Sequence, residues 1–147
     1  MHRSVDIFLE GASPQDVFEH VALLDRYPSW MRLVHKVEPL PPDDGRPAWW
    51  VELRARIGPF ARSKQLRMVR VAVEEDRSVR FERIQPDERD HANWILSARL
   101  EPAPGGTTMT MDLAYTGDLW SGGVLGRVLE EEIKRGRKSL RDVVLEA

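Results

Sequence analysis

The sequence predicts one α+β domain, in which a curved antiparallel sheet of about seven strands wraps onto a long C-terminal helix around an internal apolar cavity. Its 147 residues suit a single domain, 1-147. Between residues 33 and 116, apolar side chains recur at every second position in segments separated by turn sequences. Near the C-terminus the apolar spacing changes to steps of three and four, which indicates one long helix covering the sheet.

The N-terminal part predicts a strand followed by two helices. Residues 4–9 alternate between apolar and polar, as a half-buried strand does. Ser13 can cap free amides and Pro14 suits a first helical position, so a helix is expected from Pro14 to Leu24. A proline then prevents simple continuation, and a short second helix through Trp30 and Met31 is expected.

Period-two segments fill the middle of the chain. Short turns join them, so consecutive strands should pair antiparallel. The acidic, proline-rich stretch 39–47 is interpreted as a hairpin loop. The predicted strands cover residues 33–39, 48–57, 61–74, 78–85, 93–101 and 107–116.

The predicted closing helix covers residues 119–146. A helix of about 25 residues extends roughly 37 Å at 1.5 Å per residue, enough to cross the sheet. Its acidic residues precede its basic ones, which suits the helix dipole. Facing residues are expected to be Leu125, Leu129 and Ile133 on the helix, and Met109, Met111 and Trp94 on the strands.

Composition narrows the functional classes. With 22 basic and 24 acidic side chains the chain lacks the basic excess of nucleic-acid or anionic-membrane binders. There is no cysteine, the histidines lack metal-ligand spacing, and no membrane span or apolar leader is evident. We therefore expect a cytoplasmic protein with no metal and no cofactor. The basic residues interpreted as an ordinary solvated face are Arg54, Arg56, Arg62, Lys64 and Arg67.

Three local signatures occur in order along nearly the whole chain. They are Ser13-Pro14-Gln15-Asp16-Val17-Phe18 with Tyr27-Pro28-Ser29-Trp30, then Pro104-Gly105-Gly106-Thr107-Thr108-Met109, then Gly122-Gly123-Val124-Leu125-Gly126. Together they resemble the START/Bet v 1-like (SRPBCC) superfamily, whose bacterial members include polyketide cyclase/dehydrase-type proteins. The resemblance implies a helix-grip fold. It does not choose among lipid carriers, receptors and aromatase/cyclases, because one fold hosts many functions.

Strand phase predicts which side chains line the cavity. In 48–57 the odd-numbered residues share the inward face, whereas 61–74 changes face midway, as a β-bulge would allow. The predicted ligand-binding residues are Trp30, Val51, Leu53, Leu66, Met68, Arg70, Phe81, Arg83, Trp94, Leu96, Met109, Met111, Leu125 and Leu129.

Two of these residues, Arg70 and Arg83, are basic and point inward by phase. A buried charge needs a partner, so each either pairs with a carboxylate such as Glu132, reaches water at the open end, or anchors a ligand anion. In the aromatase/cyclases that the chain resembles, a fourth-strand arginine is implicated in folding the polyketide, and Arg70 is the closest match. Leu66 stands near a position where those enzymes carry an aromatic residue.

The leading functional hypothesis is binding of a small hydrophobic ligand, whether lipid, isoprenoid or polyketide-like. The alternative is a polyketide aromatase/cyclase or dehydratase acting on a carrier-bound intermediate. An acyl carrier protein would then be the partner, with Arg70 or Arg83 polarising a carbonyl. A third hypothesis is a partner-binding module whose cavity mouth lies near Trp30 and Trp120, with Trp50 marking the edge of a homodimer.

Overall fold

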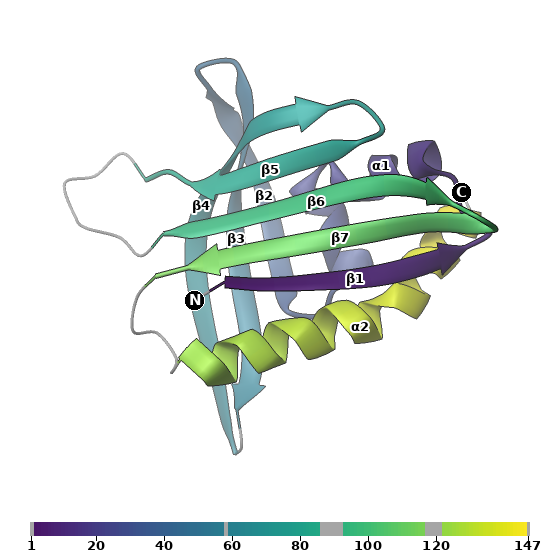
Figure 1. Cartoon of the computed structure of the whole chain (residues 1–147). Coiled ribbons are helices and arrows are strands. Elements are labelled where there is room, and N and C mark those ends of the chain that lie inside the picture. Colours follow the sequence, from purple (N-terminus) through teal and green to yellow (C-terminus); the bar gives the residue numbers. More distant parts are fainter. Residues whose placement is uncertain (1, 58, 86–92, 117–121, 147) are drawn as a thin grey trace.

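The computed structural model describes residues 2–57, 59–85, 93–116 and 122–146, without the side chains of Ile57 and of residues 122–126. It confirms the α+β helix-grip fold (Figure 1). The helices are α1 (Pro14–Val21), the 3₁₀ helix η1 (Leu24–Ser29) and α2 (Gly122–Glu146). The strands are β1 (His2–Glu10), β2 (Val34–Asp43), β3 (Arg46–Ile57), β4 (Phe60–Glu74), β5 (Ser78–Arg83), β6 (Trp94–Ala103) and β7 (Gly106–Tyr115).

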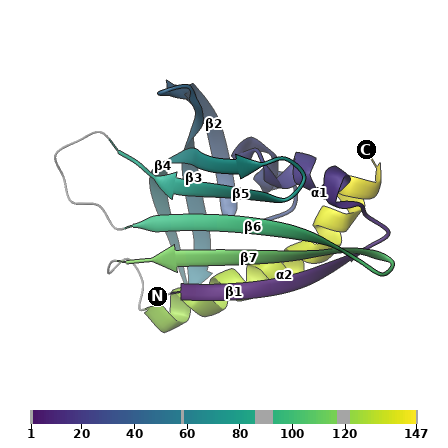
Figure 2. The same cartoon turned by 45° about the horizontal axis from the view of Figure 1, so that its top comes forward.

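The strands form one antiparallel, seven-stranded sheet in the order β1-β7-β6-β5-β4-β3-β2. The sheet is curved but not closed, because β1 and β2 are its two edges. Strands β1, β6 and β7 run across the direction of β2 and β3 (Figure 1). Helix α2 lies on one side of the sheet and passes behind β1 and β7 in Figure 2.

The β2–β3 hairpin is tighter than the sequence predicts. Instead of a loop over 39–47, the strands continue to Asp43 and resume at Arg46. The two connecting residues, Asp44 and Gly45, have φ of 51° and 78°, the left-handed conformation that the narrow hairpin turn requires. Pro39, Pro41 and Pro42 are tolerated because they lie in β2, an edge strand, where missing N–H donors need not break the sheet.

The first helix ends earlier than predicted, at Val21 rather than Leu24. Its start matches the sequence, since the Asp16 N–H donates to Ser13 Oγ at 3.2 Å. Near its end, the buried Tyr27 hydroxyl donates to the Val21 carbonyl at 2.9 Å. The short second helix is a 3₁₀ helix that ends at Ser29, so the prediction that it runs through Trp30 and Met31 is wrong by two residues.

The face change predicted within β4 is confirmed. The β4–β5 register shifts between Arg70 and Ala72, as it does at a β-bulge. Before the shift the even-numbered Leu66 and Met68 are buried, and after it the odd-numbered Val73 lies opposite Val79, which is buried on the same face of β5 as Phe81.

Helix α2 packs against β1, α1 and η1. Its buried residues recur at steps of three, four and seven, which makes one continuous apolar stripe. Gly136 lies within this stripe and passes very close to Trp30, since a Cβ at Gly136 would lie 2.6 Å from the Trp30 carbonyl oxygen. The stripe consists of Leu129, Ile133, Gly136, Leu140 and Val144.

Among helices of the described ranges, none combines the length and hydropathy needed to cross a bilayer.

Candidate ligand-binding pocket

A small apolar cavity lies between the concave face of the sheet, η1 and α2, with a volume of about 50 Å³. Alternation along β3 and β4 turns apolar residues toward it, and the bulge in β4 lies beyond the lining residues of that strand. Every lining residue is apolar, and they are Leu24, Met31, Leu33, Val34, Val51, Leu53, Leu66, Met68, Trp94, Leu96, Leu113, Leu129 and Ile133.

The structure brings half of the predicted ligand-binding residues into this wall. They are Val51, Leu53, Leu66, Met68, Trp94, Leu96 and Leu129. Their part in binding a ligand stays a prediction. The wall residues absent from the predicted set are Leu24, Met31, Leu33, Val34, Leu113 and Ile133.

These omissions have two origins. Strand phase and helical spacing already placed Leu113 and Ile133 on inward faces, so those two were recoverable. Met31 and Leu33 come from the turn between η1 and β2, where no regular period indicates the inward side.

Other predicted residues are buried elsewhere in the core. Phe81 meets the rings of Tyr27 and Trp49 edge-on, with centroids 6.2 and 5.7 Å apart. Trp30 packs on Tyr27 at 4.9 Å. Met109 and Met111 are fully buried in the core but do not line the cavity. Leu125 and Trp120 lie outside the described side chains.

Arg70 has an intramolecular partner, which is a backbone group rather than an acid. Its Nη1 donates to the Ala22 carbonyl oxygen at 2.9 Å, where Ala22 caps the end of α1. A cation is favourable there because helix carbonyls concentrate negative potential. Burial lowers the pKa of the Arg70 guanidinium. The expected partner Glu132 instead accepts from Arg32 and Arg135, at 3.3 and 3.2 Å.

Arg83 lies on the concave side of the sheet, because it pairs with the cavity residue Met68 across β4 and β5. Its Nε donates to Gln85 Oε1. Lys64 lies on the same side, opposite the cavity residue Leu53. Burial, and then the charge of Arg83, lower the pKa of the Lys64 ammonium. Lys64 was interpreted as part of a solvated face, so sequence reasoning missed this placement.

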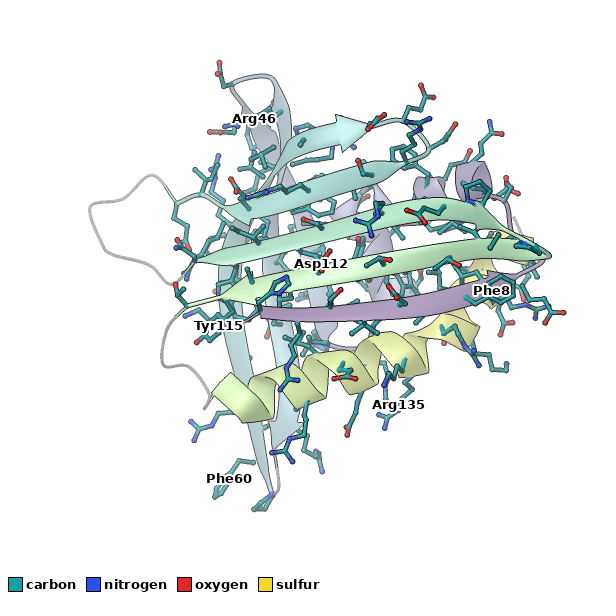
Figure 3. All side chains as sticks on the ribbon, in the orientation of Figure 1. Phe8, Arg46, Phe60, Asp112, Tyr115 and Arg135 are labelled. Atoms are coloured by element: carbon teal, nitrogen blue, oxygen red, sulfur yellow. The ribbon has the colours of Figure 1, made fainter. Side chains whose placement is uncertain are left out.

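Trp94, one of the wall residues, carries a buried polar atom. Its Nε1 is buried and has no hydrogen-bond partner among the described residues. Its ring packs against Tyr115 with centroids 4.7 Å apart, at the end of β7 labelled in Figure 3. A buried N–H without a partner is rare in native proteins and invites an acceptor from outside the chain.

A family model described as polyketide cyclase / dehydrase and lipid transport matches residues 2–145. The chain belongs to this family. This match confirms the resemblance to the START/Bet v 1-like (SRPBCC) superfamily that the sequence motifs indicated. No match is found among curated proteins.

Solved structures show that this polyketide cyclase/dehydrase-type chain shares its fold with several proteins. The di-domain ARO/CYC StfQ of the steffimycin biosynthetic pathway aligns with TM-score 0.72 at 14% identity, over 99% of this chain and 50% of that one. The chain thus spans half of that protein's length. Ara h 8.0201 aligns with TM-score 0.68 at 13% identity, over 100% and 99% of the two chains. A START superfamily protein from Mycobacterium smegmatis aligns with TM-score 0.66 at 18% identity, over 99% and 97%.

The chemistry available in this family member is mainly apolar binding with a few donors at one end. Over the residues that the structure describes, no three His, Asp or Glu side chains gather as a metal site would require. Arg70, the closest match to the aromatase/cyclase arginine, already donates to Ala22. Lys64 and Arg83 lie opposite the wall residues Leu53 and Met68, and the wall residue Trp94 carries a buried N–H.

Proposed function

We propose that the protein binds a small hydrophobic ligand, such as a lipid, an isoprenoid or a polyketide-like molecule, in the cavity between the sheet and α2. The observation that carries the proposal is the all-apolar wall, because burying apolar ligand surface against it is favourable while polar competitors gain nothing. The lipid-transport part of the family description supports it. As part of the proposal the protein works in the cytoplasm.

The cavity must expand to accept such a ligand. Its volume of about 50 Å³ is far below the roughly 300 Å³ at which ordinary ligand pockets begin. Two wall residues, Met31 and Met68, have flexible side chains that repack readily. Helix α2 rests mainly on β1, α1 and η1, so its displacement from β3 and β4 would enlarge the cavity without breaking the sheet. The structure therefore corresponds to a closed, ligand-free conformation in this proposal.

The test is displacement of a neutral fluorescent probe by 1-dodecanol, with native mass spectrometry as a second readout. The wild type should bind saturably. Leu66→Phe, which adds volume to the cavity wall, should weaken binding about tenfold, a change of about 1.4 kcal/mol. Met109→Phe is the matched control, because Met109 is equally buried on a strand but lies outside the wall. An empty wild-type protein in both assays would refute the proposal.

The alternative is an aromatase/cyclase or dehydratase acting on a carrier-bound polyketide, with an acyl carrier protein as partner. The cyclase part of the family description and the fold shared with StfQ favour it. In this proposal Arg83, which lies opposite the cavity residue Met68, polarises a substrate carbonyl. Turnover of a carrier-bound polyketide that is unchanged in Arg83→Gln would count against it.

A further inference from the structure

We propose that the ligand is an apolar acid, whose body occupies the cavity and whose carboxylate is received beside Lys64 at the end where Arg83 and Trp94 also lie. This inference rests on the proposed ligand binding and names the chemical class of the ligand. It depends on three features of that end: where the donors lie, how the nearby acids are oriented, and which buried donor lacks a partner.

Strand register places the three donors at one end of the cavity. Lys64 is opposite Leu53, and Arg83 is opposite Met68, so both emerge beside wall residues. The β5–β6 pairing ends with Glu82 opposite Ile95, and one further step of this register brings Arg83 toward Trp94. Lys64 and Arg83 therefore share the concave face of the sheet, and the Arg83 charge is the second cause, after burial, that lowers the pKa of Lys64.

Acids on the neighbouring strands do not neutralise Lys64. Glu52 follows the opposite phase from Leu53 and lies 3.7 Å from Arg54. Glu82 follows the opposite phase from Arg83 and pairs with Arg80 at 2.8 Å. Among the described residues, no carboxylate lies within 4.0 Å of the Lys64 ammonium. The Lys64 ammonium beside an apolar wall creates a positive potential, and a bound carboxylate would relieve it.

The buried polar group of the wall is also a hydrogen-bond donor, like Lys64 and Arg83. Trp94 is 3% exposed, and its orphaned Nε1–H can only donate. An ammonium, a guanidinium and an indole N–H are all donors, so an acceptor-rich, anionic group suits this end better than an amine or an alcohol. The rest of the wall is apolar, which suits an alkyl or polyketide-like body.

The experiment compares dodecanoic acid with methyl dodecanoate, both below their aggregation concentrations, by displacement of a neutral fluorescent probe. Wild type should bind the acid about tenfold more tightly than the ester. Lys64→Gln should abolish this preference and leave ester affinity unchanged. Lys36→Gln is the matched control, because Lys36 is an exposed lysine on β2, opposite Glu52 of β3. Trp94→Phe should weaken binding of the acid and keep the aromatic packing.

The outcomes separate the two proposals. If neither compound binds, the proposed ligand binding fails. If the ester and the acid bind equally well and Lys64→Gln changes neither, hydrophobic binding stands and the acid-specific inference is overturned. Retention of the preference in Lys64→Gln would overturn the assignment of Lys64 as the anchor.

Discussion

Replacing Gly136 by alanine should destabilise the protein, although alanine is the better helix former. An ideal Cβ at this position lies 2.6 Å from the Trp30 carbonyl oxygen and 3.2 Å from Trp30 Cε3. An ordinary contact of about 3.4 Å requires helix and turn to separate by about 0.8 Å. Neither side can yield by rotating a side chain, because the closest atom is main chain and Gly136 lies within a buried helix stripe.

The magnitude follows from two opposing effects. Overpacking costs typically 1–3 kcal/mol. We take the upper value of about 3 kcal/mol because a main-chain atom cannot move aside as a side chain can. Exchanging glycine for alanine inside a helix gains about 1 kcal/mol. The net loss in the free energy of unfolding should therefore be about 2 kcal/mol. For a chain of about 150 residues this corresponds to a fall in Tm of roughly 4–8 °C.

Urea and thermal unfolding, followed by far-UV circular dichroism, measure this difference. Ser139→Ala is the control, because Ser139 is exposed on the same helix and gains helix propensity without a new contact. It should be neutral or slightly stabilising. A Gly136→Ala protein more stable than wild type by about 1 kcal/mol, as propensity alone requires, would refute the close approach of α2 to Trp30.

Three further predictions concern the stability of the same fold. Tyr27→Phe removes the buried hydroxyl bond to Val21 and should lower the free energy of unfolding by about 1–2 kcal/mol in urea titrations. Burial raises the pKa of Tyr27, so stability should be level below its ordinary value of 10.0 and fall by up to about 1.4 kcal/mol per pH unit above it. That alkaline loss should shrink in Tyr27→Phe, and an unchanged slope would contradict the assignment. Gly106→Ala places a Cβ 2.2 Å from the Leu9 carbonyl oxygen and should cost about 3 kcal/mol or more, with loss of amide protection along β1.

Strand faces could be predicted from sequence wherever alternation is unbroken. Along β3, the alternation that runs through Val51 and Leu53 predicts the wall correctly, because the period of two fixes direction once one face is apolar. The bulge in β4 was also predictable, since the apolar phase changes at Arg70. These positions depend on local pattern alone.

Positions set by tertiary contacts could not be predicted in this way. Met31 and Leu33 lie in a turn without a period, so their inward orientation comes from packing beneath α2. Arg70 was predicted to point inward, but its carbonyl partner Ala22 is 48 residues away in sequence. Lys64 follows the concave phase of β4, yet Arg62 and Arg67 nearby in the sequence make an ordinary solvated face the simpler interpretation.

The location of the bound ligand tests the central claim most directly. Protein labelled with ¹³C at the methionine methyl groups should be titrated with 1-dodecanol and followed by NMR. Met31 and Met68 line the cavity, whereas Met109 and Met111 are buried outside its wall. We predict saturable shifts that are largest for Met31 and Met68, and a midpoint that moves to about tenfold higher 1-dodecanol concentration in Leu66→Phe. Equal shifts at all four methyls, or none at saturating ligand, would contradict binding in the cavity between the sheet and α2.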